Sequence, residues 1–170
     1  GSRLIEAEFE KATVWSVYVT NGREVGHEMY HTKLAFLGEL RSAIVDYQSR
    51  NSKPLIIAGD FNIAPDNSDV YDPIAWKGKI LCSDAERHCL KEITDCGFID
   101  CQKVITPITD EYTWWDYRMA GFSKNLGLRI DLLLASKSLE QQLAGVRVHR
   151  DIRMLEKPSD HCPVSLELNF

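Results

Sequence analysis

The sequence predicts a mixed fold of the α/β (α+β) class, in a single domain that spans residues 1–170. Segments with alternating or β-branched residues, typical of strands, are interspersed with two segments whose apolar residues recur every three to four positions, as in helices. Polar loops rich in Pro, Asp and Asn follow the strand ends, and chemistry usually sits on such loops. A chain of this length is sufficient for one domain with a real core.

The first two predicted elements are strands over residues 4–10 and 13–21. The first, LIEAEFE, alternates apolar and acidic residues, which is the pattern of a half-exposed strand. The second, TVWSVYVTN, is rich in β-branched and aromatic residues. We therefore expect the second strand to pair with the first.

A helix is predicted from His27 to about Gln48, where apolar residues form one face with a 3.6-residue period. The members of that face are Tyr30, Leu34, Leu37, Leu40, Ile44 and Tyr47. Pro54 separates this helix from the segment 55–61, LIIAGDF. Its run of four apolar residues indicates a strand that is buried on both faces.

A long loop over residues 64–80 is indicated by its many Pro, Asp, Asn and Gly residues. A second helix is then predicted to begin at Ser83, which can form an S-x-x-E capping box with Glu86, and to end near Gly97. The remaining predicted strands cover residues 129–136, 145–152 and 164–170.

The net charge of −5 argues against a surface that binds nucleic acid everywhere without specificity. The charge is uneven, because residues 118–157 carry eight basic and four acidic side chains, a local net charge of +4. A local basic face and an ordinary mixed surface are equally compatible with that composition.

No apolar run approaches the roughly 18 residues of a membrane span, so we expect no membrane partner. The opening stretch GSRLIEAEFE lacks the apolar region of a secretory signal. The five cysteines are an odd number and form no C-x-x-C pair, which argues against a structural zinc site. This cysteine usage indicates a reducing, cytoplasmic compartment.

The stretch Gly59-Asp60-Phe61-Asn62 follows the predicted buried strand immediately. Asp60 is a candidate general base or metal ligand, and the amide of Asn62 can both donate and accept hydrogen bonds. The alternative is a simple turn after a strand, because Asp and Asn are common at such positions.

Asp131 interrupts an otherwise apolar strand, and a buried carboxylate is costly unless a cation, a metal ion or a hydrogen bond meets it. A salt bridge with Arg129 is a structural alternative, although adjacent strand residues point to opposite faces. The stretch PSDHCPV places Asp160 beside His161, and both can serve one site only if they lie on a loop. A histidine needs a carboxylate to fix its tautomer and raise its pKa, so we expect Asp131 to orient His161.

Aromatic residues stand beside polar ones at two further places. Tyr18 lies near the end of the second predicted strand and is by default a half-buried strand aromatic. The stretch 113–118, TWWDYR, places three aromatic residues beside Arg118. Such a cluster is either ordinary packing or a platform that stacks on a base or sugar.

Together, these stretches resemble the exonuclease III-like apurinic/apyrimidinic endonucleases of the endonuclease–exonuclease–phosphatase superfamily. The resemblance runs from Arg3 to Phe170 in the family's order of motifs. The stretches that carry it are VYVTNGR (17–23), LIIAGDFNIAP (55–65), YTWWDYR (112–118), NLGLRIDLLLAS (125–136) and EKPSDHCPV (156–164). GDFN and SDH are shared across the superfamily, whereas WWDYR and GLRIDLLLAS point to its bacterial DNA-repair branch.

The resemblance implies that the chain is the C-terminal portion of a four-layer α/β/β/α sandwich with mixed, largely antiparallel sheets. It implies a metal-dependent DNA-repair phosphodiesterase of the exodeoxyribonuclease III or AP endonuclease type. Such an enzyme hydrolyses the phosphodiester 5′ to an abasic site and removes 3′-terminal nucleotides. The implied cofactor is Mg²⁺ or Mn²⁺, and the implied partner is double-stranded DNA with abasic sites or 3′ ends.

The resemblance also implies catalytic roles for particular residues. Asp60 would activate the attacking water, and Asn62 would orient that water or bind the developing oxyanion. Asp131 would hold His161 against the scissile phosphate. Tyr18 would donate a hydrogen bond to the phosphate or assist the leaving group.

Metal and DNA contacts are implied in the same way. The metal ligands would be Asp60, Asn62 and Asp160. Trp114 would form part of the pocket for the baseless sugar. The remaining implied DNA contacts are Arg23, Asn125 and Arg129.

The chain departs from the family pattern in two ways. Thr20 stands where a Pro usually follows Tyr-Val, which removes a fixed φ from that loop. Family members also carry an additional N-terminal section, which holds the Glu that is their principal metal ligand. The resemblance therefore implies a truncated domain with weakened metal affinity and an exposed apolar sheet face. We expect self-association, or an N-terminal partner, through that face and its strand edge.

Three functions follow from these observations. The first is a DNA-repair nuclease of the bacterial cytoplasm. The second is a catalytically impaired or partner-dependent nucleic-acid-binding fragment of the same family, because the metal-ligand Glu is absent. The third is a superfamily hydrolase that acts on phosphoinositides, sphingomyelin or undamaged DNA, and the WWDYR and GLRIDLLLAS stretches argue against it.

Overall fold

The structure is a computed structural model that describes residues 3–107 and 111–170. Its described strands form one five-stranded sheet, in the order β1-β2-β3-β7-β4, and two sheets of two strands each. The strands of the large sheet are β1 (Leu4–Glu8), β2 (Thr13–Tyr18), β3 (Leu55–Asp60), β4 (Phe98–Asp100) and β7 (Asp131–Ser136).

The large sheet is mixed and mostly antiparallel. The pairs β1–β2, β3–β7 and β4–β7 run antiparallel, whereas β2 and β3 run parallel. The predicted α/β class with mixed, largely antiparallel sheets is therefore confirmed. The predicted pairing of the first two strands is confirmed as well.

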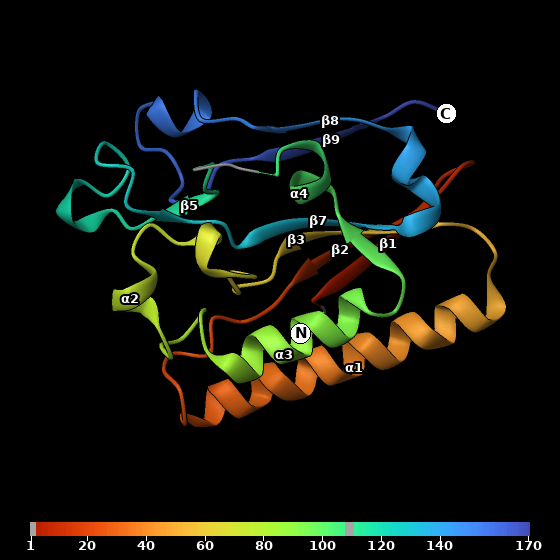
Figure 1. Cartoon of the computed structure of the whole chain (residues 1–170), viewed down its shortest axis with the longest axis horizontal. Helices are drawn as coiled ribbons and strands as arrows, with labels where there is room; N and C mark the ends of the chain where they lie inside the picture. Colours follow the sequence, from red (N-terminus) through yellow and green to blue (C-terminus); the bar gives the residue numbers. More distant parts are fainter. Residues whose placement is uncertain (1–2, 108–110) are drawn as a thin grey trace.

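Two helices, α1 (Glu28–Arg50) and α3 (Asp84–Thr94), lie side by side along one face of this sheet (Figure 1). His27 caps α1, because its Nδ1 accepts a hydrogen bond from the backbone N–H of Met29 at 3.0 Å. Ser83 and Glu86 form the predicted capping box at the start of α3.

The core between the helices and the sheet is built by the predicted apolar stripe of α1. Leu37, Leu40 and Ile44 are buried there against strand residues that include Ile57 and Leu132. The stripe is narrower than predicted, because Leu34 and Tyr47 are only partly buried. Burial of this stripe is what fixes α1 on the sheet.

A second layer covers the opposite face of the sheet. The strands β8 (Leu143–Val148) and β9 (Val164–Leu168) pair antiparallel, and Figure 1 shows them on the side away from α1. Apolar residues of β8 and β9 pack on Ile56 and Leu133 of the large sheet. Helices, sheet and second sheet therefore stack as the predicted portion of a layered sandwich would.

Several short elements lie in stretches that were expected to be loops. They are α2 (Pro73–Trp76), α4 (Cys101–Ile105), β4, β5 (Trp114–Trp115) and β6 (Gly127–Leu128). Short 3₁₀ turns cover Asn67–Asp69, Arg118–Ala120, Lys137–Gln142 and Ile152–Met154. Segments of two to six residues are too short to show a hydrophobic period, so the sequence did not reveal them.

Within the described ranges, no helix is both long and apolar enough to cross a membrane. The five cysteines all lie in the described part of the chain, and all five are free thiols.

A groove of about 550 Å³ opens on the β8–β9 side of the large sheet. Its apolar lining includes Val14, Ile56, Ala58, Leu166 and Leu168. Among the described residues, β9 pairs only with β8, so its other edge has no partner strand. This groove and edge form the face on which self-association or an N-terminal partner was predicted, and that expectation stays a prediction.

Of the two predicted occupants of this face, a second copy of the chain or an N-terminal partner, the first can be tested with this chain alone. Apolar surface and an unpaired strand edge favour association. Multi-angle light scattering at micromolar concentration should then give a dimer mass. The variant Leu168→Glu, which places a charge in the groove, should give a monomer. A monomeric unsubstituted chain at the same concentration would contradict the prediction.

Candidate active site

A pocket of about 410 Å³ lies where β2 and β3 end and β7 begins. The strand register explains why candidate residues meet there. Tyr18 pairs with Asp60 across the parallel β2–β3 ladder, and Asp60 pairs with Asp131 across the antiparallel β3–β7 ladder. Three side chains from distant parts of the sequence therefore stand in one row across the sheet.

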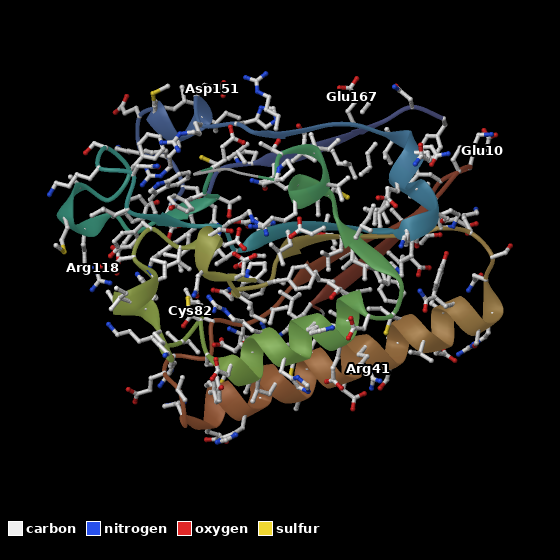
Figure 2. All side chains as sticks on the ribbon, viewed as in Figure 1. Glu10, Arg41, Cys82, Arg118, Asp151 and Glu167 are labelled. Atoms are coloured by element: carbon white, nitrogen blue, oxygen red, sulfur yellow. The ribbon has the colours of Figure 1, made fainter. Side chains whose placement is uncertain are left out.

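Loops from both halves of the chain complete the pocket. The predicted residues among its lining are Tyr18, Asp60, Asn62, Trp114, Asp160 and His161. Arg118 and Leu81 also line it. Figure 2 places the labelled Arg118, and Cys82 next to Leu81, toward the left end of the view, which is the end that holds the pocket.

Asp60 emerges at a point where β2 and β3 approach closely. Gly59 has a φ of 142°, and a Cβ at that position would collide with the carbonyl oxygen of Val17. Only glycine fits there. The Asp60 carboxylate accepts hydrogen bonds from the backbone N–H of Asn62 at 2.8 Å and from its Nδ2 at 2.7 Å.

The environment of Asp60 favours its protonated form more than water does. Burial, and then the negative charge of Asp131, raise the pKa of Asp60 to about 7. The charge of His161 and the hydrogen bond from Asn62 act in the opposite direction. A carboxylate with a pKa near neutrality is suited to take up a proton from water.

His161 and Asp131 form the predicted pair. His161 Nδ1 lies 2.9 Å from Oδ2 and 3.1 Å from Oδ1 of Asp131. Burial alone lowers the pKa of His161, but the hydrogen bond and charge of Asp131, together with the charges of Asp60 and Asp160, outweigh it, so this pKa lies above its ordinary value. The carboxylate thereby holds the ring and favours the imidazolium.

The loop that carries His161 is anchored to the segment 112–115. The backbone N–H of Trp115 donates to Asp160 O at 3.0 Å, and that of Cys162 donates to Thr113 O at 2.7 Å. Asp160 and His161 lie between β8 and β9, outside both strands, as the adjacency of two functional side chains predicted.

Trp114 and Asp160 face the pocket together, because Trp114 Nε1 donates to Asp160 Oδ2 at 2.9 Å. Tyr18 lies on the same rim and is half exposed, with the guanidinium of Arg3 5.5 Å from its ring centroid. These positions agree with the predicted placement of all three residues at one site.

The predicted metal ligands are brought together only in part. Asp60 and Asn62 are hydrogen-bonded to each other, and Asp160 stands on the pocket wall with one oxygen bonded to Trp114. Among the described residues, the group of acidic and imidazole side chains close enough to share one ion is Asp60, Asp131 and His161. Asp160 is not a member of that group.

Asn21 is a pocket residue to which no role was assigned from the sequence. Its Nδ2 donates to Asn62 Oδ1 at 3.3 Å, and both residues line the pocket. The signal was available, because Asn21 follows β2 just as Asn62 follows β3, and parallel strands end at the same edge of a sheet.

Arg23 and Asn125 are not among the residues that line the pocket. Arg23 is exposed and has a left-handed φ of 65°. Asn125 Oδ1 accepts hydrogen bonds from Trp115 Nε1 at 3.2 Å and from Arg150 Nη1 at 3.0 Å, beside the pocket rather than in it. Their predicted contacts with DNA therefore remain predictions about the surroundings of the site.

The expectation that Arg129 contacts DNA is wrong in this structure. The Arg129 side chain is 1% exposed, and its guanidinium donates to Asp69 at 2.7 Å and to Asp100 at 2.7 and 3.0 Å. The partners lie 60 and 29 residues away in the sequence, so only the fold brings them together. Arg129 thus has a structural role. The alternative salt bridge between Arg129 and Asp131 does not form, because the Arg129 guanidinium is bonded to Asp69 and Asp100.

The variant Arg129→Met is expected to lose about 3–5 kcal/mol of unfolding free energy, because it removes the cation shared by Asp69 and Asp100. Of these two carboxylates, only Asp69 keeps a second cation among the described residues, Lys103, whose Nζ lies 2.9 Å away. Urea denaturation followed by circular dichroism measures this loss. Arg50→Met serves as a control, since the Arg50–Asp46 pair is exposed and should contribute less than about 1 kcal/mol. Equal effects of the two substitutions would contradict the structural role of Arg129.

The mixed sheet thus presents a half-buried Asp60, two amide side chains and His161, held by Asp131, at one pocket of an α/β domain. The chain belongs to the endonuclease/exonuclease/phosphatase family, whose model matches residues 3–161.

Within this family, the chain is 33% identical over 169 residues to an exodeoxyribonuclease of Bacillus subtilis, covering 99% of this chain and 64% of that protein. Among solved structures, it resembles a 3′ phosphatase from Neisseria bound to a product DNA hairpin. That likeness has a TM-score of 0.95 and 38% identity, and covers 99% of this chain and 65% of the other.

It also resembles an AP endonuclease from Archaeoglobus fulgidus, with a TM-score of 0.91 and 31% identity, covering 99% of this chain and 65% of the other. The chain therefore spans somewhat less than two thirds of the length of these relatives.

Proposed function

We propose that the protein is a DNA-repair phosphodiesterase of the exodeoxyribonuclease III or AP endonuclease type. It would hydrolyse the phosphodiester 5′ to an abasic site and remove 3′-terminal nucleotides from double-stranded DNA. The observation that carries this proposal is the row of Tyr18, Asp60 and Asp131 across the sheet, with Asp131 hydrogen-bonded to His161, which lines the same pocket as Tyr18 and Asp60. Relatives named for nuclease and 3′ phosphatase activity support the same class of substrate.

In the proposed reaction, Asp60 takes the proton of the attacking water. Its pKa of about 7 suits a general base that works near neutral pH. The Nδ2 group of Asn62 is bonded to Asp60 and to Val19 O, which holds the amide in place beside the base. Asn62 would thereby orient the water that Asp60 activates.

His161 would face the scissile phosphate while its Nδ1 stays bonded to Asp131. Because Asp131 favours the imidazolium, the ring can offer a positively charged donor to the negative charge that develops on phosphoryl oxygens. Tyr18, on the pocket rim, would donate its hydroxyl proton to the phosphate or the leaving group.

A divalent cation, Mg²⁺ or Mn²⁺, is part of the proposal. The residues at the pocket fit a hard cation, because carboxylate and amide oxygens are the ligands it prefers, with water and phosphate oxygens completing its shell. Asp60, with Asn62 beside it and Asp160 on the wall, would hold the ion. When bound, the ion would polarise the phosphate and stabilise its negative charge.

The surroundings of the pocket would bind the DNA. Trp114 lines the pocket with its indole held by Asp160, and it would contact the baseless sugar. Arg23 and Asn125 would contact the strand outside the pocket. We place the protein in the cytoplasm of a bacterium, in keeping with this function.

The proposal is tested with a set of labelled duplexes that carry an abasic site, a 3′-phosphate or an unmodified recessed 3′ end. With Mg²⁺, we expect a nick 5′ to the abasic site and shortening from the 3′ ends, and we expect chelation by EDTA to abolish both. Salt-sensitive binding without any cleavage would instead favour a nucleic-acid-binding fragment. Hydrolysis of sphingomyelin or a phosphoinositide in place of DNA would contradict the proposal.

A further inference from the structure

A buried ion pair lies directly behind the candidate pocket. Lys33 of α1 and Glu86 of α3 both have 0% exposed side chains, and the ammonium contacts the carboxylate directly. Two charges taken out of water are costly unless their remaining hydrogen-bonding positions are filled. The other partners of Lys33 and Glu86 therefore show what the pair holds in place.

The two remaining hydrogen bonds of Lys33 go to the main chain of pocket residues. Its Nζ donates to Asn62 O at 2.6 Å and to Asn21 O at 3.2 Å. An ammonium has three N–H donors, so these two carbonyls and Glu86 account for all of them. One nitrogen atom thus joins the two loops whose amide side chains meet in the pocket.

Glu86 extends the same network to a third wall of the pocket. Its Oε1 accepts from the backbone N–H of Leu81 at 3.1 Å, and its Oε2 accepts from Ser83 N at 3.0 Å and Ser83 Oγ at 2.6 Å. Leu81 lines the pocket, and Ser83 begins α3. The carboxylate therefore fixes this wall relative to both helices.

The backbone conformations of two pocket residues also indicate that the Lys33–Glu86 pair holds the pocket main chain in place. Asn62 has a φ of 51° and Leu81 a φ of 72°, in the left-handed region that residues other than glycine rarely adopt. Such conformations persist only where the surroundings hold them, and they cluster at functional sites. Each of these two residues has a main-chain group bonded to the Lys33–Glu86 pair.

We propose that the Lys33–Glu86 pair is the positioning element of the site, holding the main chains of Asn21, Asn62 and Leu81 so that the two amides face the reacting phosphate. Neither Lys33 nor Glu86 lines the pocket, so the pair acts through these residues. The catalytic consequence rests on the proposed function, whereas the positioning itself is independent of it.

The test variant is the double substitution Lys33→Met with Glu86→Gln. It removes both charges together, so no unpaired charge is left buried. The amide that replaces the Glu86 carboxylate has one acceptor oxygen, which can still accept from Leu81 N, and its NH2 group can donate to Ser83 Oγ. What is lost is therefore the donor to Asn21 O and Asn62 O, together with the acceptor for Ser83 N. The matched control is Leu40→Ala on the same helix, a core position that loses stability through a cavity without touching the pocket.

The first readout is independent of activity. In ¹H–¹⁵N correlation spectra, the backbone and side-chain amide signals of Asn21 and Asn62, and the backbone signal of Leu81, are expected to move in the double variant. In Leu40→Ala these signals should stay in place. The second readout is steady-state cleavage of an abasic duplex at a temperature where all protein variants are folded. There, kcat of the double variant should fall about 100-fold, with KM nearly unchanged. The Leu40→Ala control should keep the kcat of the unsubstituted protein.

Unmoved amide signals in the folded double variant would overturn the positioning role. Moved signals with an unchanged kcat would overturn its catalytic consequence. If the unsubstituted protein cleaves no DNA, the proposed function fails, while the spectra still decide the positioning role. The variant Lys33→Gln with Glu86→Gln keeps a buried donor at position 33, so it provides the same readouts if the first variant does not fold, with smaller expected effects.

Discussion

Replacing Asp60 by Asn is expected to lower the rate of DNA cleavage by about 10²- to 10⁴-fold, which is the contribution of a positioned general base. The Asn side chain has nearly the volume of the Asp side chain and can still accept a hydrogen bond from the backbone N–H of Asn62. It cannot, however, take a proton from water. Asp60 stands in one row with Tyr18 and Asp131 and has a pKa of about 7. The single-turnover rate on an end-labelled abasic duplex measures the effect.

The control for this substitution is Asp46→Asn. Asp46 lies on the exposed side of α1, where it pairs with Arg50 away from the pocket. The rate should stay at the level of the unsubstituted protein, and circular dichroism should show both variants folded. A folded Asp60→Asn variant that keeps more than about a tenth of the rate would remove Asp60 from the role of base.

Asp131→Asn and His161→Gln are each expected to lower the cleavage rate by about 10³- to 10⁴-fold, because an orienting carboxylate and its imidazole work as one unit. Asp131 holds Nδ1 of His161 at 2.9 Å and favours the charged ring. The double variant should therefore be no slower than the slower single variant. The four single-turnover rates, those of the unsubstituted protein, the two single variants and the double variant, test this coupling in one double-mutant cycle.

His149→Gln is the matched control for the histidine substitution. His149 is bonded to Ser165 Oγ at 2.8 Å and does not line the pocket, so its loss should leave the rate unchanged. If the losses of Asp131→Asn and His161→Gln instead multiply in the double variant, the two residues act separately, and the proposed pair is contradicted.

The sequence was most informative where a residue type conflicted with its surroundings. Asp131 was identified because a carboxylate in an apolar strand needs a partner, and the structure gives it His161. The apolar stripe of α1 and the capping box of α3 could also be predicted, because helical periodicity and helix caps are local sequence signals. The loop position of Asp160 and His161 followed from the alternation of side chains in strands.

Long-range pairing could not be predicted from those signals. The row of Tyr18, Asp60 and Asp131 depends on the register of one parallel and one antiparallel ladder, and register is set by the whole sheet. The family resemblance implied that Arg129 contacts DNA, and no local feature of the sequence indicates that two distant carboxylates enclose its guanidinium. The fold alone decides between those two environments.

The burial of Lys33 could not be predicted from local sequence rules. Its spacing of three from Tyr30 and four from Leu37 places it on the apolar face of α1. A lysine on a helix is nevertheless almost always assigned to solvent, because it is rarely buried without a partner. The partner is Glu86, which the sequence identified only as a capping residue. The combination of both roles in one carboxylate requires the packing of α1 against α3.

The most direct test of the central claim, that this pocket hydrolyses DNA, is incubation of the purified chain with an abasic duplex and Mg²⁺. Sequencing gels should show a single nick 5′ to the abasic site that leaves a 3′-hydroxyl. The same product should be absent with Asp60→Asn and with His161→Gln. An intact duplex after incubation with the folded chain, or equal cleavage by the unsubstituted protein and both variants, would contradict the account.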